Sequence, residues 1–185
     1  MTTIPISPEI INALAKSLDI TSLGSSSIRE IVQLVNKIEE KTGVKFIGTL
    51  RKTARIRHGI GSSIEDILGW DTILKAKDGE CYEFYAAQPP LIGLTQAQPT
   101  CCPLGIVAFG NYKIDIKEAI KIFHSQNGGD KFTHVTLSWP LVHPEAKEPF
   151  WHFRTNLGFD VVIGANSGQI NNLPPTVILY MAKPQ

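Results

Sequence analysis

The stretch from Phe150 to Ile170, FWHFRTNLGFDVVIGANSGQI, constrains the fold of this 185-residue chain more than any other segment. From Trp151 to Arg154 aromatic side chains alternate with polar ones, which is the period of a β-strand with one buried face. Leu157-Gly158 then supplies the composition of a tight hairpin turn. The sequence therefore predicts a hairpin with one buried and one polar face. The buried face carries Trp151, Phe153 and Thr155, and the polar face carries His152 and Arg154.

A helix and a strand are expected before this hairpin. The segment DIKEAIKIFH has apolar residues at helical spacing, with Asp115 and Glu118 placed to cap the first turn. The next segment, KFTHVTLSW, alternates as a strand does. One face of that strand should carry Thr133, Val135, Leu137 and Trp139, and the other Phe132, His134, Thr136 and Ser138.

The first half of the chain carries three helix-start signals and one hairpin signal. Capping residues predict helices over 8–18 and 27–43, and the segment SSIEDILGW carries a third capped start. Asp78-Gly79 predicts a hairpin turn, and the proline-rich stretch 89–103 predicts a surface loop that divides the chain. We expect a helical and hairpin part over 1–88 and a helix plus antiparallel sheet over 104–185, joined in one compact domain. TVILYMA near the C-terminus predicts one further strand.

The order helix, strand, strand, strand between Ile114 and Ile170 resembles the PepSY-type module. In the closing turn, GANSGQI, the residues Ala165, Ser167 and Gly168 are of the types that the family motif has at these positions. Gly164 and Gln169 stand where the family more often has acidic residues. The resemblance implies a cystatin-like helix on a small antiparallel sheet and a role in binding or restraining another protein, with no chemistry. The predicted fold class is therefore α+β, with helices packed on an antiparallel sheet.

The composition and the cysteine content limit the classes of partner and the cellular compartment that we expect. Eighteen Lys and Arg against seventeen Asp and Glu give a formal charge of +1, so no global field attracts nucleic acid or an anionic membrane. The N-terminus does not resemble a secretory signal. Cys81, Cys101 and Cys102 form a sparse, odd set, unlike a disulfide framework. These features favour a reducing, cytoplasmic setting with inert thiols, and the alternatives are a soft-metal site or a vicinal disulfide at Cys101-Cys102.

The hairpin offers two candidate sites. His152 and Arg154, with Asp160 across the strands, can form a recognition surface for an acidic partner, although a plain hairpin explains the same pattern. The alternative site is an apolar pocket between helix and sheet that would hold a small ligand. Its expected lining is Trp139, Trp151, Phe153 and Phe159.

A basic run, RKTARIRHG, gives a third candidate, an anion site. Its cations are Arg51, Lys52, Arg55 and Arg57. The following GIGSS can lead into a helix N-terminus, an arrangement that binds phosphate, but it lacks the lysine and glycine spacing of a phosphate loop. A strand edge protected by basic residues is the alternative explanation.

No catalytic or metal-binding motif is present. His134, His143 and His152 are equally spaced, but equal spacing is not metal-ligand spacing, so neither a metal nor a cofactor is predicted. The predicted function is a non-catalytic cytoplasmic binding or regulatory module acting on a protein partner. The alternative is a small-ligand-binding protein or an enzyme with the apolar pocket described above.

Overall fold

A computed structural model describes residues 46–88, 93–126, 130–140 and 146–170. The helices predicted over 8–18 and 27–43, and the strand predicted from TVILYMA, lie outside the described residues. The described strands are β1 (Phe46–Ile56), β2 (Ile67–Ala76), β3 (Cys81–Ala87), β4 (Gly93–Leu94), β5 (Gln98–Thr100), β6 (Ile106–Val107), β7 (Phe132–Pro140), β8 (Phe150–Thr155) and β9 (Asp160–Gly164). The described helices are the 3₁₀ turns η2 (Arg57–Gly59) and η3 (Ile64–Asp66) and the α-helix α3 (Ile116–His124).

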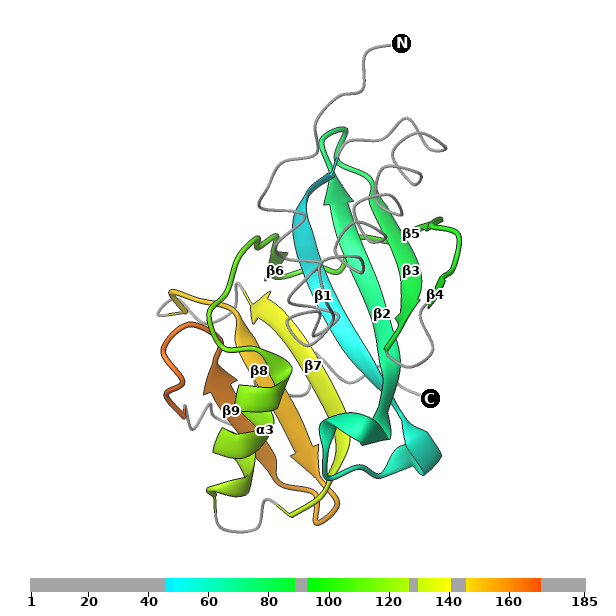
Figure 1. Cartoon of the computed structure of the whole chain (residues 1–185). Coiled ribbons are helices and arrows are strands. Elements are labelled where there is room, and N and C mark those ends of the chain that lie inside the picture. The colour runs from blue at the N-terminus through cyan, green and yellow to red at the C-terminus, as the bar shows by residue number, and fades with distance from the viewer. Residues whose placement is uncertain (1–45, 89–92, 127–129, 141–145, 171–185) are drawn as a thin grey trace, which may run out of the picture.

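The described strands form one nine-stranded antiparallel sheet (Figure 1). Its main order is β4-β3-β2-β1-β7-β8-β9, with β5 added to β3 and β6 added to β7. The expectation of helices packed on a sheet was wrong for these residues, because α3 is their single α-helix. The pairing of β1 with β7 joins strands from both halves of the chain into this sheet.

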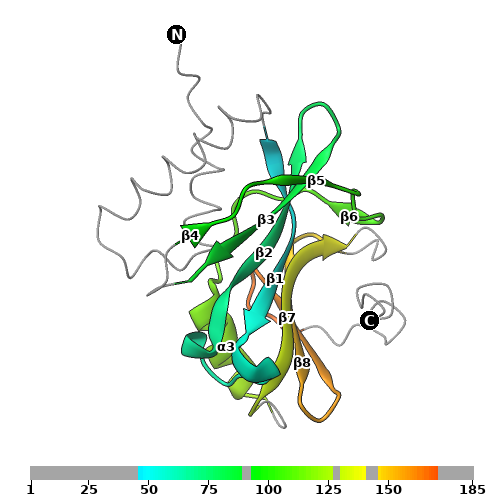
Figure 2. The same cartoon turned by 90° about the vertical axis from the view of Figure 1, so that its right-hand side faces the viewer.

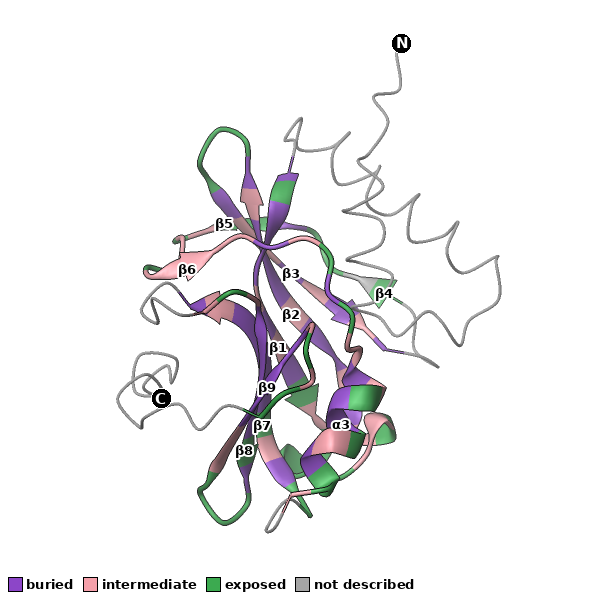
Figure 3. Cartoon of the chain, turned by 90° about the vertical axis from the view of Figure 1, so that its left-hand side faces the viewer, coloured by how far each residue is buried: buried purple, intermediate pink, exposed green. Residues whose placement is uncertain are grey.

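The core lies between α3 and one face of the sheet. Asp115 caps the helix by accepting a hydrogen bond from the Glu118 amide, as the sequence predicts. The buried side of the helix carries Ile116, Ala119, Ile120 and Phe123. The sheet bends so that its concave side faces away from α3 (Figures 2 and 3). Aromatic rings from helix and strands are in contact here, with Phe123 stacked on Phe153 at 4.9 Å.

The segment from β5 to β6 crosses the concave side at the upper end of the sheet (Figure 2). A smaller apolar cluster involves Leu50, Ile73 and Cys81 from the sheet, and the half-buried Cys102 packs against it. A disulfide joins Cys81 to Cys102, so the expectation that the cysteines are inert thiols was wrong for this pair. The sequence does not indicate this pair, because the two cysteines come together only through the pairing of β5 with β3, which places Thr100 opposite Cys81.

Three local expectations differ from the structure. The capped start at Ser63 leads only into η3, after which β2 begins at Ile67. A register shift after Phe132 turns that ring into the core, away from the side of His134 where simple alternation placed it. The β8–β9 hairpin has a longer turn than the two residues expected. Asn156 belongs to it, and Gly158 adopts a φ of 84°, which glycine tolerates without strain.

Candidate partner-binding face

The sheet face opposite α3 carries a continuous row of mainly polar side chains across six strands. Directly paired residues share a face, so the strand registers determine its members. From β3 to β9 the row is Tyr85, Asp71, Thr53, Thr136, His152 and Val162. We call this row, together with Arg51, Arg55, Arg154 and Asp160 beside it on the same face, the polar face.

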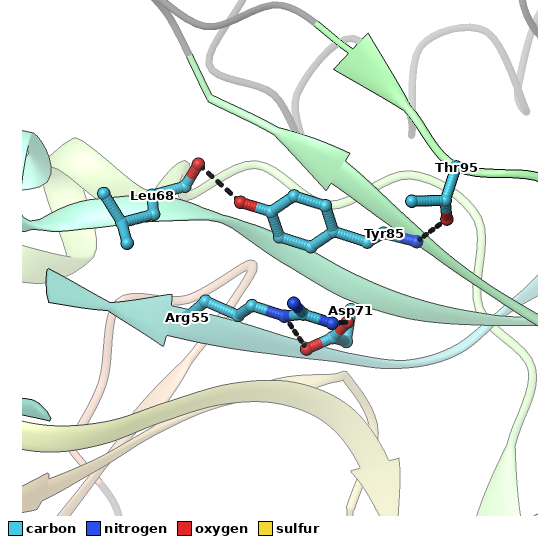
Figure 4. Close-up of polar contacts among 5 residues, drawn as sticks. All are labelled: Arg55, Leu68, Asp71, Tyr85 and Thr95. Atoms are coloured by element: carbon cyan, nitrogen blue, oxygen red, sulfur yellow. Dashed lines mark hydrogen bonds and ion pairs between the residues drawn. The ribbon is translucent and has the colours of Figure 1, made fainter.

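One end of the polar face is organised by Arg55, Asp71 and Tyr85 (Figure 4). Arg55 Nε and Nη2 donate to the two carboxylate oxygens of Asp71 at 2.8 and 2.7 Å, and the hydrogen bond raises the pKa of Arg55. The guanidinium carbon also lies 4.3 Å from the centroid of the Tyr85 ring. Tyr85 Oη donates to the Leu68 carbonyl at 2.9 Å, and a Cβ on Gly69 would collide with the Tyr85 ring. The Arg55 side chain, 57% exposed, is therefore held in a fixed orientation.

The β8–β9 hairpin supplies a second pair of the same design. Arg154 Nε and Nη2 donate to the Asp160 carboxylate at 3.1 and 3.0 Å, and the Arg154 side chain remains 44% exposed. The structure thus brings together Arg154 and Asp160, the pair that the sequence placed across the two strands. In both pairs the carboxylate accepts hydrogen bonds from Nε and Nη2 of the arginine. Nη1 makes no hydrogen bond to another described residue and keeps both of its donors.

Of the two histidines on the polar face, His152 differs from the expectation of an exposed side chain. His152 is only 6% exposed, and its Nε2 has no hydrogen-bond partner among the described residues. Burial is the main reason that its pKa falls to about 4. His134 is exposed by its surface area, yet burial of its ring also lowers its pKa, and Arg154 and Arg51 add to that effect. His152 is therefore an uncharged imidazole at neutral pH.

The basic run does not form one anion site. Because β1 alternates, Arg51 and Arg55 lie on the polar face, whereas Lys52 points to the opposite side and is buried. Arg57 lies in η2, beyond the end of the strand. The alternative of a basic strand edge is also wrong, because β1 is an inner strand between β2 and β7.

Of the four residues expected to line a pocket, three meet in the core and one lies outside it. Trp151 and Phe153 are fully buried in the core, and Trp151 Nε1 donates to the Ile114 carbonyl at 2.8 Å. Trp139 is half-buried and packs against that core. Phe159 stands in the hairpin turn and is 67% exposed, so it lines no interior site. Stacked and edge-on rings occupy the region between α3 and the sheet, with Trp151 5.8 Å from Tyr112.

The two residues of the polar face that hold Arg55 were missed by sequence inspection. Asp71 and Tyr85 become partners of Arg55 only through the registers of β1, β2 and β3. The available signal was the Asp78-Gly79 turn, since it fixes the pairing of β2 with β3. Within the described residues no group of three or more His, Cys, Asp or Glu is placed to hold a metal ion.

Comparisons of the chain with family models, with curated proteins and with solved structures find no match. The PepSY resemblance stays a prediction. Among the described helices none is long and apolar enough to cross a membrane.

Proposed function

We propose that this chain is a non-catalytic binding module that holds a protein partner against its polar face. The observation that carries the proposal is the pair of arginines, Arg55 and Arg154, each oriented by a carboxylate on the same face of the sheet. Arginine and tyrosine are enriched among residues that dominate binding energy, and a guanidinium that is already oriented loses less entropy on binding. Acidic or carbonyl-rich segments of a partner fit the remaining Nη1 donors.

The filled core supports binding at the surface over an interior reaction site. A small-ligand protein is expected to keep a hollow interior with a few polar groups, whereas contacting rings occupy the core here. The PepSY resemblance points to the same class of function, the binding or restraint of another protein. A cytoplasmic location stays a prediction, and the disulfide between Cys81 and Cys102 weighs against it because reducing compartments rarely maintain such bonds.

The test is affinity capture with three baits, prepared without reductant. The first is the unaltered chain, the second carries Arg55→Ala and Arg154→Ala, and the third carries Glu118→Ala and Lys121→Ala, which remove an exposed ion pair on α3 instead. At least one protein should be captured by the first and third baits and lost by the second. That protein, once purified, should bind the second bait at least about tenfold more weakly than the third. Equal capture by all three baits contradicts the proposal.

A further inference from the structure

The Cys81–Cys102 disulfide lies on the same side of the sheet as the polar face. Ile73 pairs directly with Arg51 of that face, and Lys75 pairs directly with Cys81. Every second residue of a strand shares a face, so Lys75 and Cys81 lie on the side of Ile73. Residues 98–107, which run from β5 to β6 across this end of the sheet, are called the covering segment (Figure 2).

Strand pairing holds the covering segment only at its two ends. At one end β5 pairs three residues with β3, and at the other β6 pairs two residues with β7. Between these ends, 101–105 makes no strand pairing. Cys102 and Ile106 pack from the segment against Leu50 and Ile73 of the sheet. The disulfide is therefore the covalent tie that keeps the middle of the segment on this apolar cluster.

A lysine side chain contacts the disulfide. Lys75 Nζ lies 3.6 Å from Cys102 Sγ, and it also donates to the Gly79 carbonyl at 2.8 Å. The bond to Gly79 holds the charged amine beside the sulfur, and no carboxylate of the described residues lies within ion-pair distance of it. A cation in this position stabilises negative charge on the sulfurs, which develops when a thiolate attacks a disulfide.

The two sulfurs differ in their access to solvent. Cys81 is fully buried, whereas Cys102 is half-buried. Exchange between thiols and disulfides depends on which sulfur the attacking thiolate can reach. Attack from solvent is therefore expected at Cys102, the sulfur that Lys75 contacts.

We infer that the Cys81–Cys102 bond is a thiol-exchange site that small thiols open in the folded protein, and that its state determines whether the covering segment stays on the sheet. Release of the segment uncovers Leu50 and Ile73 on the same side of the sheet as Arg51. This exchange needs no protein partner, so it is independent of the proposed function.

The exchange balances with a small monothiol as the reductant. Its thiolate forms a bond to Cys102 Sγ while the bond to Cys81 breaks, and Cys81 leaves with the electron pair. A second thiolate then attacks the external sulfur of the mixed disulfide, and Cys102 leaves as a thiolate beside Lys75. The two protons that the small thiols lose end on Cys81 and Cys102. Two monothiols are thus oxidised to one small disulfide, and the two cysteines are reduced.

The test treats folded full-length chains with reduced glutathione at pH 7, quenches with N-ethylmaleimide, and locates the adducts by peptide mass spectrometry. All chains carry Cys101→Ser, which removes an exposed free thiol. The first mixed disulfide should form on Cys102. Lys75→Met should slow the opening at least about fivefold. Lys77→Met, which removes the same charge at an exposed position two residues along, should change the rate by less than about twofold.

Hydrogen exchange follows the covering segment itself. After glutathione treatment, peptides over 98–107 should exchange at least about tenfold faster, while peptides over β8 keep their protection. Cys102→Ser, which cannot form the bond, should show the same fast exchange over 98–107 without any thiol.

Three results would overturn this inference. The first is a bond that opens only in proportion to the unfolded fraction as urea is added, and the second is equal opening rates in the two lysine variants. The third is hydrogen exchange over 98–107 that stays the same after the bond has opened.

Discussion

Acidification is expected to destabilise the fold through His152. The folded pKa of about 4 lies below the ordinary value of 6.5, so the unfolded chain takes up a proton at a higher pH than the folded chain does. The stabilisation is present in full above about pH 6.5 and is lost as the pH falls toward 4. The folded and unfolded pKa values of His152 thus differ by about 2.5, which at 1.36 kcal/mol per unit corresponds to a stabilisation of about 3 kcal/mol. Between pH 7 and pH 5 the expected loss of stability is about 2 kcal/mol.

The assay is urea unfolding at intervals from pH 7 to pH 4, with His152→Leu compared with the unaltered chain. The unfolding free energy of the variant should fall less over this range, by about 2–3 kcal/mol, whatever its stability at pH 7. Thr136→Val is the matched control, since Thr136 is buried directly opposite His152 and does not titrate. That control should follow the unaltered chain. If His152→Leu loses stability as steeply as the unaltered chain does, the buried, uncharged state assigned to His152 is wrong.

Three further predictions concern stability measured by chemical denaturation. Lys52→Met should raise the unfolding free energy at pH 7 by about 1 kcal/mol or more. Because burial lowers the pKa of Lys52 in the folded chain, the stability of the unaltered protein should rise as the pH increases toward 10.5, and the variant should lack this rise. A destabilised variant would contradict this. Reduction of the Cys81–Cys102 bond, whose cysteines are 21 residues apart, should cost about 3 kcal/mol, and an unchanged midpoint in reductant would refute its structural role. Trp151→Ala should cost about 3–5 kcal/mol and Arg154→Ala no more than about 1 kcal/mol, and the reverse order would exchange the two faces of β8.

Local sequence patterns predicted the elements whose partners lie nearby in the chain. The alternation of β8 placed Trp151 and Phe153 in the core, and the cap at Asp115 marked the start of α3. Both patterns depend on a neighbour a few residues away, so the sequence contains the whole signal. The bulge after Phe132 could not be predicted, because the cause of the register shift lies in strand pairing and not in the residues of β7 alone.

Long-range pairing accounts for what the sequence could not show. Arg55 forms its ion pair with Asp71, sixteen residues away in the sequence. Cys81 forms a disulfide with Cys102, which the pairing of β5 with β3 brings close. The burial of His152 was missed for a related reason. A polar residue on the face away from a helix is usually solvated, and alternation identifies the face of a side chain but not what covers it.

The basic run, which the sequence presented as a solvated edge or an anion site, lies at the centre of the sheet. Stability alone favours β-branched and aromatic residues on an inner strand, yet β1 places Lys52 toward the core and Arg55 on the polar face. Positions that break local rules at a cost are expected where function maintains them. Since β1 contributes to both the polar face and the buried amine, this strand is where substitutions should separate binding from stability most clearly. Arg55→Ala should weaken partner capture with little change in stability, and Lys52→Met should change stability while partner binding is retained.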